Sequence, residues 1–162
     1  MSNDLSYEIK DDAIISFRGR EYGFLSNLYA YKIEINYKGY KFYSVEAAYH
    51  GAKHGTEENL AKFSEIRRGD LAKKMSMTKK FKRDIRPDWD DVKEEIMREL
   101  VWAKFSQNER LKERLLSTGD KQLVESNDWG DTYWGVCNGV GLNRLGEILM
   151  EVRDKLRDIE NN

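Results

Sequence analysis

Four side chains that could carry acid–base chemistry share one face of a helix predicted for residues 45–53. At relative positions i, i+3, i+4 and i+7 they are Glu46, Tyr49, His50 and Lys53. The other positions of this helix are small or apolar, so it can pack closely against its neighbours and half-bury the polar face. A carboxyl group held there is suited to proton transfer, whereas the alternative is an ordinary, partly exposed Glu–Lys face.

A second candidate is the turn-rich segment that covers residues 125–143. Trp129 and Trp134 lie close together in it, beside Asp128 and Gly135. Aromatic faces stack on bases and sugars, and glycines let backbone N–H groups approach phosphate or ribose. The alternatives are that both tryptophans fill the core and that Asp128 only forms a turn or caps a helix.

A third candidate is a turn over residues 20–28, where polar side chains stand beside aromatic ones. The residues in it that could touch a ligand are Arg20, Tyr22, Gly23, Phe24, Ser26 and Asn27. The alternative is a plain connection between strands.

Several familiar site motifs are absent from the sequence. It has no P-loop, no G-x-G-x-x-G after a strand and no H-E-x-x-H. His50 and His54 could bind zinc with Glu46 as a third ligand, but we expect neither a metal nor a cofactor. The single cysteine, Cys137, excludes an internal disulfide and fits a reducing compartment, and nothing positions it beside a histidine as a nucleophile.

Composition narrows the class of protein further. The 162 residues carry 28 basic and 29 acidic side chains, which excludes a strongly basic, histone-like binder. With 40% hydrophobic residues the chain should fold, and no apolar stretch approaches the ~20 residues that span a bilayer. The polar, acidic start is neither a secretory signal nor a transit peptide, so we expect a cytoplasmic protein without membrane contact.

Charge is unevenly distributed along the chain. Residues 62–87 carry ten Lys or Arg against three Asp or Glu, and residues 88–99 carry two against six. One interpretation is a solvated helical surface, and the other is a patch that receives the phosphate of a nucleotide or nucleic acid.

The hydrophobic pattern predicts an α+β fold, mostly helical, with a small antiparallel sheet in the N-terminal third. The expected elements are a strand over 14–17, a hairpin over 33–43, and helices over 45–53, 88–105 and 145–159. Ser44 and Asp88 can cap two of these helices. We expect a flexible N-terminus over residues 1–12 and one domain over residues 13–159.

The sequence resembles the NADAR family of YbiA-like N-glycosidases. The opening motifs match Tyr22-Gly23-Phe24-Leu25-Ser26-Asn27 and Ser44-Val45-Glu46-Ala47-Ala48-Tyr49 through Lys53. Further matches follow in order, among them Arg86-Pro87-Asp88-Trp89, Trp134-Gly135 and Asn143-Arg144-Leu145-Gly146. No single motif is decisive, but the ordered set is specific and covers nearly the whole chain.

The resemblance implies a compact fold and hydrolysis of an N-glycosidic bond between ribose C1′ and a nitrogen. Members similar to this chain act on ribosylamino-pyrimidine intermediates of riboflavin synthesis, and others remove ADP-ribose from guanine in nucleic acid. The expected partner is therefore a small ribosyl or ADP-ribosyl substrate, or ADP-ribosylated nucleic acid. The oligomeric state is left open.

The resemblance also assigns roles. Glu46 is the expected general acid/base, Asp128 holds ribose or water, and Lys53 neutralises phosphate or attacks an opened ribose to form an imine. The expected substrate-binding residues are Arg18, Arg20, Tyr22, Gly23, Phe24, Ser26, Asn27, Tyr49, His50, Trp89, Trp129, Trp134, Gly135 and Asn143.

The chain departs from the family pattern near this site. The family usually has Gln where this chain has His50 and Ala where it has Gly51, and residues 136–138 lack the usual glycines. These changes bear on the substrate more than on the reaction. Two rival functions are a module that binds NAD or ADP-ribose without cleaving it, and a metal-dependent hydrolase built on His50, His54 and Glu46.

Overall fold

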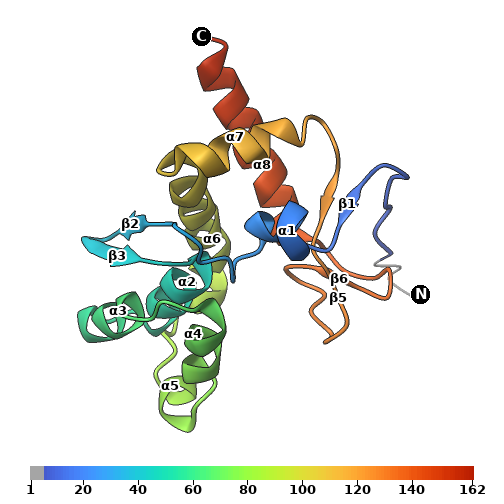
Figure 1. Cartoon of the computed structure of the whole chain (residues 1–162). Helices are drawn as coiled ribbons and strands as arrows, with labels where there is room; N and C mark the ends of the chain where they lie inside the picture. Colours follow the sequence, from blue (N-terminus) through green and yellow to red (C-terminus); the bar gives the residue numbers. More distant parts are fainter. Residues whose placement is uncertain (1–5) are drawn as a thin grey trace. The chain divides into compact units, whose positions relative to one another are not determined.

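The computed structural model describes residues 6–162, and Figure 1 shows its elements. The chain divides into two compact units, one of residues 27–111 and one of residues 6–26 with 112–162. Most residues in regular elements are helical, and the small antiparallel sheet lies where it was expected, so the predicted α+β class is confirmed. The predicted flexible terminus lies partly outside the described residues, and the boundaries of the single domain stay a prediction.

The unit of residues 27–111 holds the hairpin and the helices of the first candidate site. Its elements are β2 (Ile35–Tyr37), β3 (Tyr40–Phe42), α2 (Val45–His54), α3 (Glu57–Ser64), α4 (Gly69–Ser76), α5 (Lys79–Arg83), α6 (Trp89–Ser106) and the first residues of α7 (Glu109–Ser117). Between β2 and β3, Lys38 has φ 49° and Gly39 has φ 82°. A two-residue turn with positive φ at both positions matches the twist of a hairpin, and glycine adopts it without steric cost.

Helix α2 is the centre of this unit and packs against α3, α4 and α6. It begins as predicted, because the Ser44 side chain accepts the backbone N–H of Ala47 at 3.0 Å. It ends one residue later than expected, and Gly55 closes it in the left-handed conformation with φ 62°. At Gly51 an added Cβ would lie 3.3 Å from Cβ of Phe63, so the glycine lets α3 approach closely.

The side-chain cap predicted for α6 does not form. Asp88 occupies the N-cap position, but its side chain makes no capping hydrogen bond. Both carboxylate oxygens instead accept from the Arg86 guanidinium, at 2.6 and 2.9 Å. A bidentate pair between two charged groups is stronger than one hydrogen bond to a backbone N–H, so the neighbouring arginine takes the carboxylate.

The second unit consists of a long helix and short, irregular segments. Its elements are β1 (Ile14–Ile15), α1 (Gly19–Tyr22), the 3₁₀ helix η1 (Gly23–Leu25), the rest of α7, β4 (Leu123–Val124), β5 (Ser126–Asn127), β6 (Val136–Cys137) and α8 (Arg144–Glu160). β1 pairs in parallel with β4, and β5 pairs in parallel with β6. The strand predicted over 14–17 forms only as β1. The sequence did not predict either parallel pairing, because the paired segments are too short to show a period.

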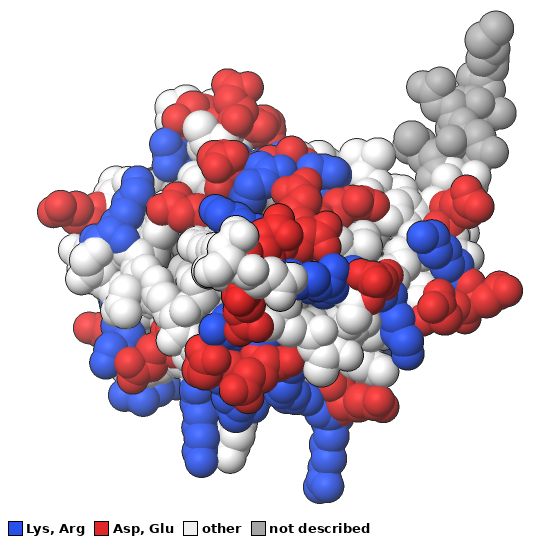
Figure 2. All heavy atoms as spheres, turned by 90° about the horizontal axis from the view of Figure 1, so that it is seen from above, with Lys and Arg blue, Asp and Glu red and all other residues white. Residues whose placement is uncertain are grey.

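Figure 2 shows Lys, Arg, Asp and Glu side chains interspersed over the face that it draws. Within the basic stretch of residues 62–87, ion pairs neutralise some of the cations. Lys62 pairs with Glu58 at 2.8 Å, and Arg68 pairs with Asp70 at 2.7 Å. In the described part of the chain, no helix has the length and apolar character needed to cross a bilayer.

His54, at the end of α2, belongs to the hydrophobic core. Its ring stacks on Phe63 at 5.6 Å between centroids and lies 5.0 Å from Phe81, and its Nε2 is 2.8 Å from Oγ of Ser76. The side chain is 2% exposed. Burial, and then the nearby His50 and Lys53, lower the pKa of His54 to about 4.

The buried His54 predicts a specific loss of stability in acid. The unfolded chain binds a proton at this ring from about pH 6.5 downward, whereas the folded chain does so only near its pKa of about 4. The free energy of unfolding should therefore fall between these pH values, by on the order of 3 kcal/mol. Urea denaturation from pH 7 to pH 4.5 measures it. The variant His54→Gln should show a flatter pH dependence, and an unchanged slope in that variant would contradict the assignment.

Candidate active site

The hydrogen bond between Glu46 and His50 is the centre of the candidate site. Nε2 of His50 lies 2.9 Å from Oε1 of Glu46, one helical turn earlier. The Glu46 side chain is 16% exposed and that of His50 is 10% exposed, so the pair is mostly shielded but still reachable from solvent. The helix predicted from spacing has therefore brought these two residues together.

The other ring nitrogen of His50 indicates which atom carries the proton. Nδ1 is buried and has no hydrogen-bond partner among the described residues. A buried N–H without an acceptor is less favourable than a bare acceptor nitrogen, so the geometry favours a neutral ring with its proton on Nε2. In that tautomer His50 donates to Glu46, which accepts as a carboxylate.

Lys53 lies two turns after Glu46 and is half-buried. Burial lowers the pKa of its ammonium group below the usual value, the nearby Glu46 opposes this effect, and Lys93 reinforces it. The charge of Glu46 thus acts on Lys53, which places both residues in one electrostatic environment.

Aromatic rings flank the same face of α2. The Tyr49 ring packs edge-on against Trp89 with centroids 5.0 Å apart and against His50 at 5.4 Å. Trp89 is 7% exposed, so it supports Tyr49 from the core more than it offers a surface to a ligand. The backbone carbonyl of Asn27 accepts the N–H of Glu46 at 2.9 Å, which ties the segment after residue 26 to the first turn of α2.

The other predicted site residues lie in the second unit, and several of them have structural tasks there. Asn143 is fully buried, accepts the backbone N–H of Glu125 at 2.9 Å and donates to the carbonyl of Leu123 at 2.9 Å. A Cβ added at Gly135 would lie 2.3 Å from the carbonyl oxygen of Glu125, which is too close for any side chain at this position. Asn143 and Gly135 therefore shape the loop, and the structure gives neither an open face toward a ligand.

Trp129 is the most accessible aromatic residue of this loop, with 55% of its surface exposed. This contradicts the alternative that it fills the core. The Arg18 guanidinium carbon lies 5.9 Å from the ring centroid of Trp129, so these two candidates meet. Trp134 is half-buried and packs edge-on against Tyr133 at 4.8 Å, and Asp128 is exposed.

Residues 20–26 form a turn that a single arginine holds. Arg114 donates to the backbone carbonyls of Arg20 and Glu21, at 2.9 and 3.0 Å. Its guanidinium also lies 4.2 Å from the ring centroid of Phe24, which is 2% exposed. Phe24 is thus a core residue. Of the other candidates in this turn, Arg20 is exposed, whereas Tyr22, Gly23 and Ser26 are partly covered.

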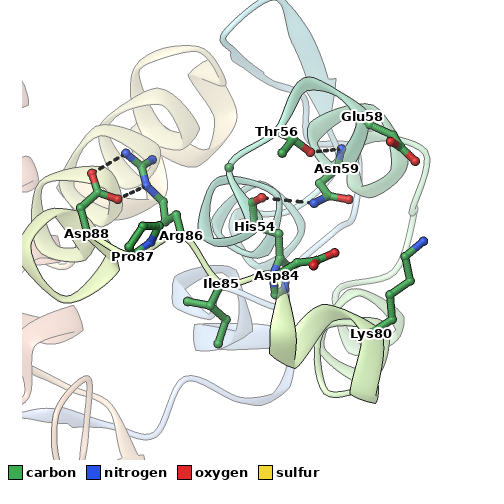
Figure 3. Close-up of a pocket in the computed structure, with 11 residues that line it drawn as sticks. His54, Thr56, Glu58, Asn59, Lys80, Asp84, Ile85, Arg86, Pro87 and Asp88 are labelled. Atoms are coloured by element: carbon green, nitrogen blue, oxygen red, sulfur yellow. Dashed lines mark hydrogen bonds and ion pairs between the residues drawn. The ribbon is translucent and has the colours of Figure 1, made fainter.

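A pocket of about 770 Å³ lies at the C-terminal end of α2 (Figure 3). Its lining includes none of the predicted site residues. Side chains that line it already bond to the protein, since Arg86 pairs with Asp88 and the Asn59 amide donates to the His54 carbonyl at 3.1 Å. The pocket is therefore distinct from the Glu46–His50 pair.

The zinc alternative finds no geometric support in residues 6–162. No group of three or more His, Cys, Asp or Glu side chains there is arranged to hold a metal ion. His50 bonds to Glu46 while His54 bonds to Ser76, so the two histidines have different partners.

Comparison with known proteins gives a consistent result. The model of the NADAR domain matches residues 16–157. The N-glycosidase YbiA of Shigella boydii is 33% identical over 151 residues, covering 91% of each chain. A riboflavin biosynthesis protein of Vibrio vulnificus is 34% identical over 157 residues, which are 96% of this chain and 41% of that protein. The NMR structure of YbiA from Escherichia coli superposes with a TM-score of 0.80 at 29% identity, over 98% of this chain and 92% of that one.

The coupling between Lys53 and its neighbours predicts opposite shifts in two variants. Glu46→Gln removes a negative charge and should lower the pKa of Lys53 further, whereas Lys93→Gln removes a positive charge and should raise it. Carbon-13 NMR titration of the reductively methylated protein measures both shifts, with Lys53→Arg to assign the signal. Shifts of the same sign in the two variants would contradict the described environment.

Proposed function

The chain belongs to the NADAR domain family and is an N-glycosidase, and we propose that it hydrolyses the bond between ribose C1′ and a base nitrogen with Glu46 as the general acid/base. The substrate class we propose is a ribosylated or ADP-ribosylated base. It is either a ribosylamino-pyrimidine of riboflavin synthesis or ADP-ribosyl-guanine in nucleic acid.

The observation that carries this proposal is the Glu46–His50 hydrogen bond of 2.9 Å at a mostly shielded position. A carboxylate that accepts from a neutral histidine is ready to take a proton. In the proposed reaction, a water oxygen bonds to C1′ as the C1′–N bond breaks, and Glu46 takes the water's proton. The same carboxyl group then delivers that proton to the nitrogen of the leaving base, so atoms and charge balance.

Neighbouring residues have proposed supporting roles. Lys53 in its protonated form would hold a phosphate, and its free amine could instead attack an opened ribose to form an imine. Burial favours the free amine, which the imine route requires, and the charge of Glu46 favours the ammonium. Asp128 as a ligand of ribose or water, and Trp129 as a stacking surface for the base, stay predictions.

Substitution of Glu46 tests the proposed function directly. Glu46→Gln keeps the size of the side chain but cannot move the proton, so turnover should fall by about 100- to 10,000-fold. Wild type, this variant and the exposed control Glu57→Gln would each be given guanine-ADP-ribosylated DNA and, separately, 5-amino-6-(ribosylamino)uracil phosphate, with products identified by mass spectrometry. Glu57→Gln should match wild type.

Each outcome of this assay has a distinct meaning. Release of ADP-ribose or of ribose 5-phosphate by wild type identifies the substrate branch. Full turnover by Glu46→Gln would remove Glu46 from the mechanism. Ligand that stays bound and intact with wild type would favour the module that binds NAD or ADP-ribose without cleaving it.

His50 should act as a positioning residue for Glu46. His50→Gln keeps an N–H donor that can reach the carboxylate and should retain activity within about tenfold. His50→Phe fills the space beside Phe63 but has no donor, so kcat should fall by about 10- to 100-fold with little change in KM. Steady-state kinetics with circular dichroism of each variant measure this. Equal kcat values for His50→Phe and wild type would exclude the role.

A further inference from the structure

A second pocket, of about 530 Å³, lies in the unit of residues 27–111. The residues that define it come from the segment before β2, from β2 itself, from the residues preceding α2 and α4, and from the two residues that follow α6. They include Lys32, Asn36, Tyr43, Arg67, Gln107 and Asn108. We refer to it as the Lys32–Arg67 pocket. Neither Glu46 nor His50 lines it.

Along one wall of this pocket, two side-chain amides form paired hydrogen bonds with the backbone of the hairpin, as a neighbouring β-strand would. Oε1 of Gln107 accepts the N–H of Asn36 at 2.8 Å, and Nε2 donates to the carbonyl of the same residue at 3.3 Å. Asn108 makes the same pair of bonds with Glu34, at 3.3 and 3.0 Å. The amides of Gln107 and Asn108 are therefore engaged by the backbone of the hairpin, so polar recognition by this pocket must come from other groups.

Two cations in the lining have no acidic partner among the described residues. The guanidinium of Arg67 lies 4.1 Å from the ring centroid of Tyr43, and Nζ of Lys32 lies 5.3 Å from that of Tyr31. Both cations are exposed. Arg68, the next residue, shows the contrast, because its guanidinium is engaged by both carboxylate oxygens of Asp70.

The acidic side chain in the lining does not neutralise these cations. Glu34 forms an ion pair with Lys41 at 3.3 Å. The N–H groups of the Arg67 guanidinium donate no hydrogen bond within residues 6–162, and the guanidinium lies over the Tyr43 ring instead. An arginine that rests on a ring keeps its planar donors in place and available to an anion.

We propose that the Lys32–Arg67 pocket binds the phosphate group of a nucleotide, either free or within a nucleic-acid strand. The guanidinium fork matches two phosphate oxygens, and the lysine supplies a second positive charge. Exposed aromatic surface lies beside one of these charges, at the edge of the pocket, because Tyr31 is 60% exposed and Nζ of Lys32 lies 5.3 Å from its ring centroid. Cations combined with an exposed ring favour a nucleotide over a simple inorganic anion, since a base can stack on the ring.

This inference concerns binding and does not depend on the role of Glu46. A binding assay therefore distinguishes failure of this proposal from failure of the proposed hydrolysis.

The test compares two double variants that each remove two positive charges. One is Lys32→Gln with Arg67→Gln, and the control is Lys79→Gln with Lys82→Gln, which lie exposed on α5 in the same unit. The probes are a fluorescein-labelled single-stranded oligothymidylate, followed by anisotropy over a range of salt concentrations, and AMP, followed by calorimetry. Circular dichroism and thermal unfolding verify that each variant folds.

The pocket variant should bind its probe about tenfold or more weakly than wild type, and the control should stay within about twofold. For the oligonucleotide, loss of two phosphate contacts should also reduce the slope of log K against log salt by roughly 1.4. Arg67→Lys, which keeps the charge but not the fork, should lie between wild type and the pocket variant.

The two probes distinguish the sources of the phosphate. A larger loss for the oligonucleotide indicates a nucleic-acid strand, and a larger loss for AMP indicates a free nucleotide. Equal weakening in the pocket variant and the α5 control would assign binding to diffuse charge and overturn the proposal. Unchanged binding of both probes by the pocket variant, or no binding of either by wild type, would overturn it as well.

Discussion

The hydrogen bond between Glu46 and His50 is the interaction on which the candidate active site depends. It can form because α2 begins at a Ser44 cap and places the two side chains one turn apart. Nδ1 of His50 is buried and has no hydrogen-bond partner in the described chain, and the ring lies 6.3 Å from that of Phe63 on α3. The enclosed nitrogen in turn favours the proton on Nε2, and this sets Glu46 as the acceptor. The chemistry proposed for the carboxylate thus follows from the packing of a neighbouring ring.

The two histidines of α2 show how strongly the surroundings decide the role of a side chain. His50 and His54 lie one turn apart, and both contact Phe63. His54 faces the core and bonds to Ser76, and its burial lowers its pKa to about 4. His50 faces the polar side of the helix and bonds to a carboxylate. The same residue type at the same helical spacing therefore serves stability in one place and, in our proposal, catalysis in the other.

The sequence predicted the elements whose periodicity is long or whose turns are distinctive: α2, the hairpin, α6 and α8. It predicted that Glu46, Tyr49, His50 and Lys53 share a face, because that depends only on helical spacing. It could not predict that the Asp88 carboxylate pairs with Arg86 instead of capping α6, or that the Asn143 side chain bonds to the backbone of Leu123 and Glu125. Both outcomes depend on which of several possible partners is nearest in the folded chain. The sequence could not predict the Lys32–Arg67 pocket either, because its two cations and the amides of Gln107 and Asn108 come from segments far apart in the chain.

Nitrogen-15 NMR of the histidine rings is the measurement that tests the central claim most directly. Long-range proton–nitrogen correlations of selectively labelled protein, assigned with His50→Gln, report which nitrogen of His50 carries the proton at neutral pH. We predict a neutral ring with Nε2 protonated and Nδ1 bare, and a signal at Nε2 that changes in Glu46→Gln. A ring protonated at Nδ1, or an Nε2 signal that is indifferent to Glu46, would contradict the view that His50 holds Glu46 as a carboxylate.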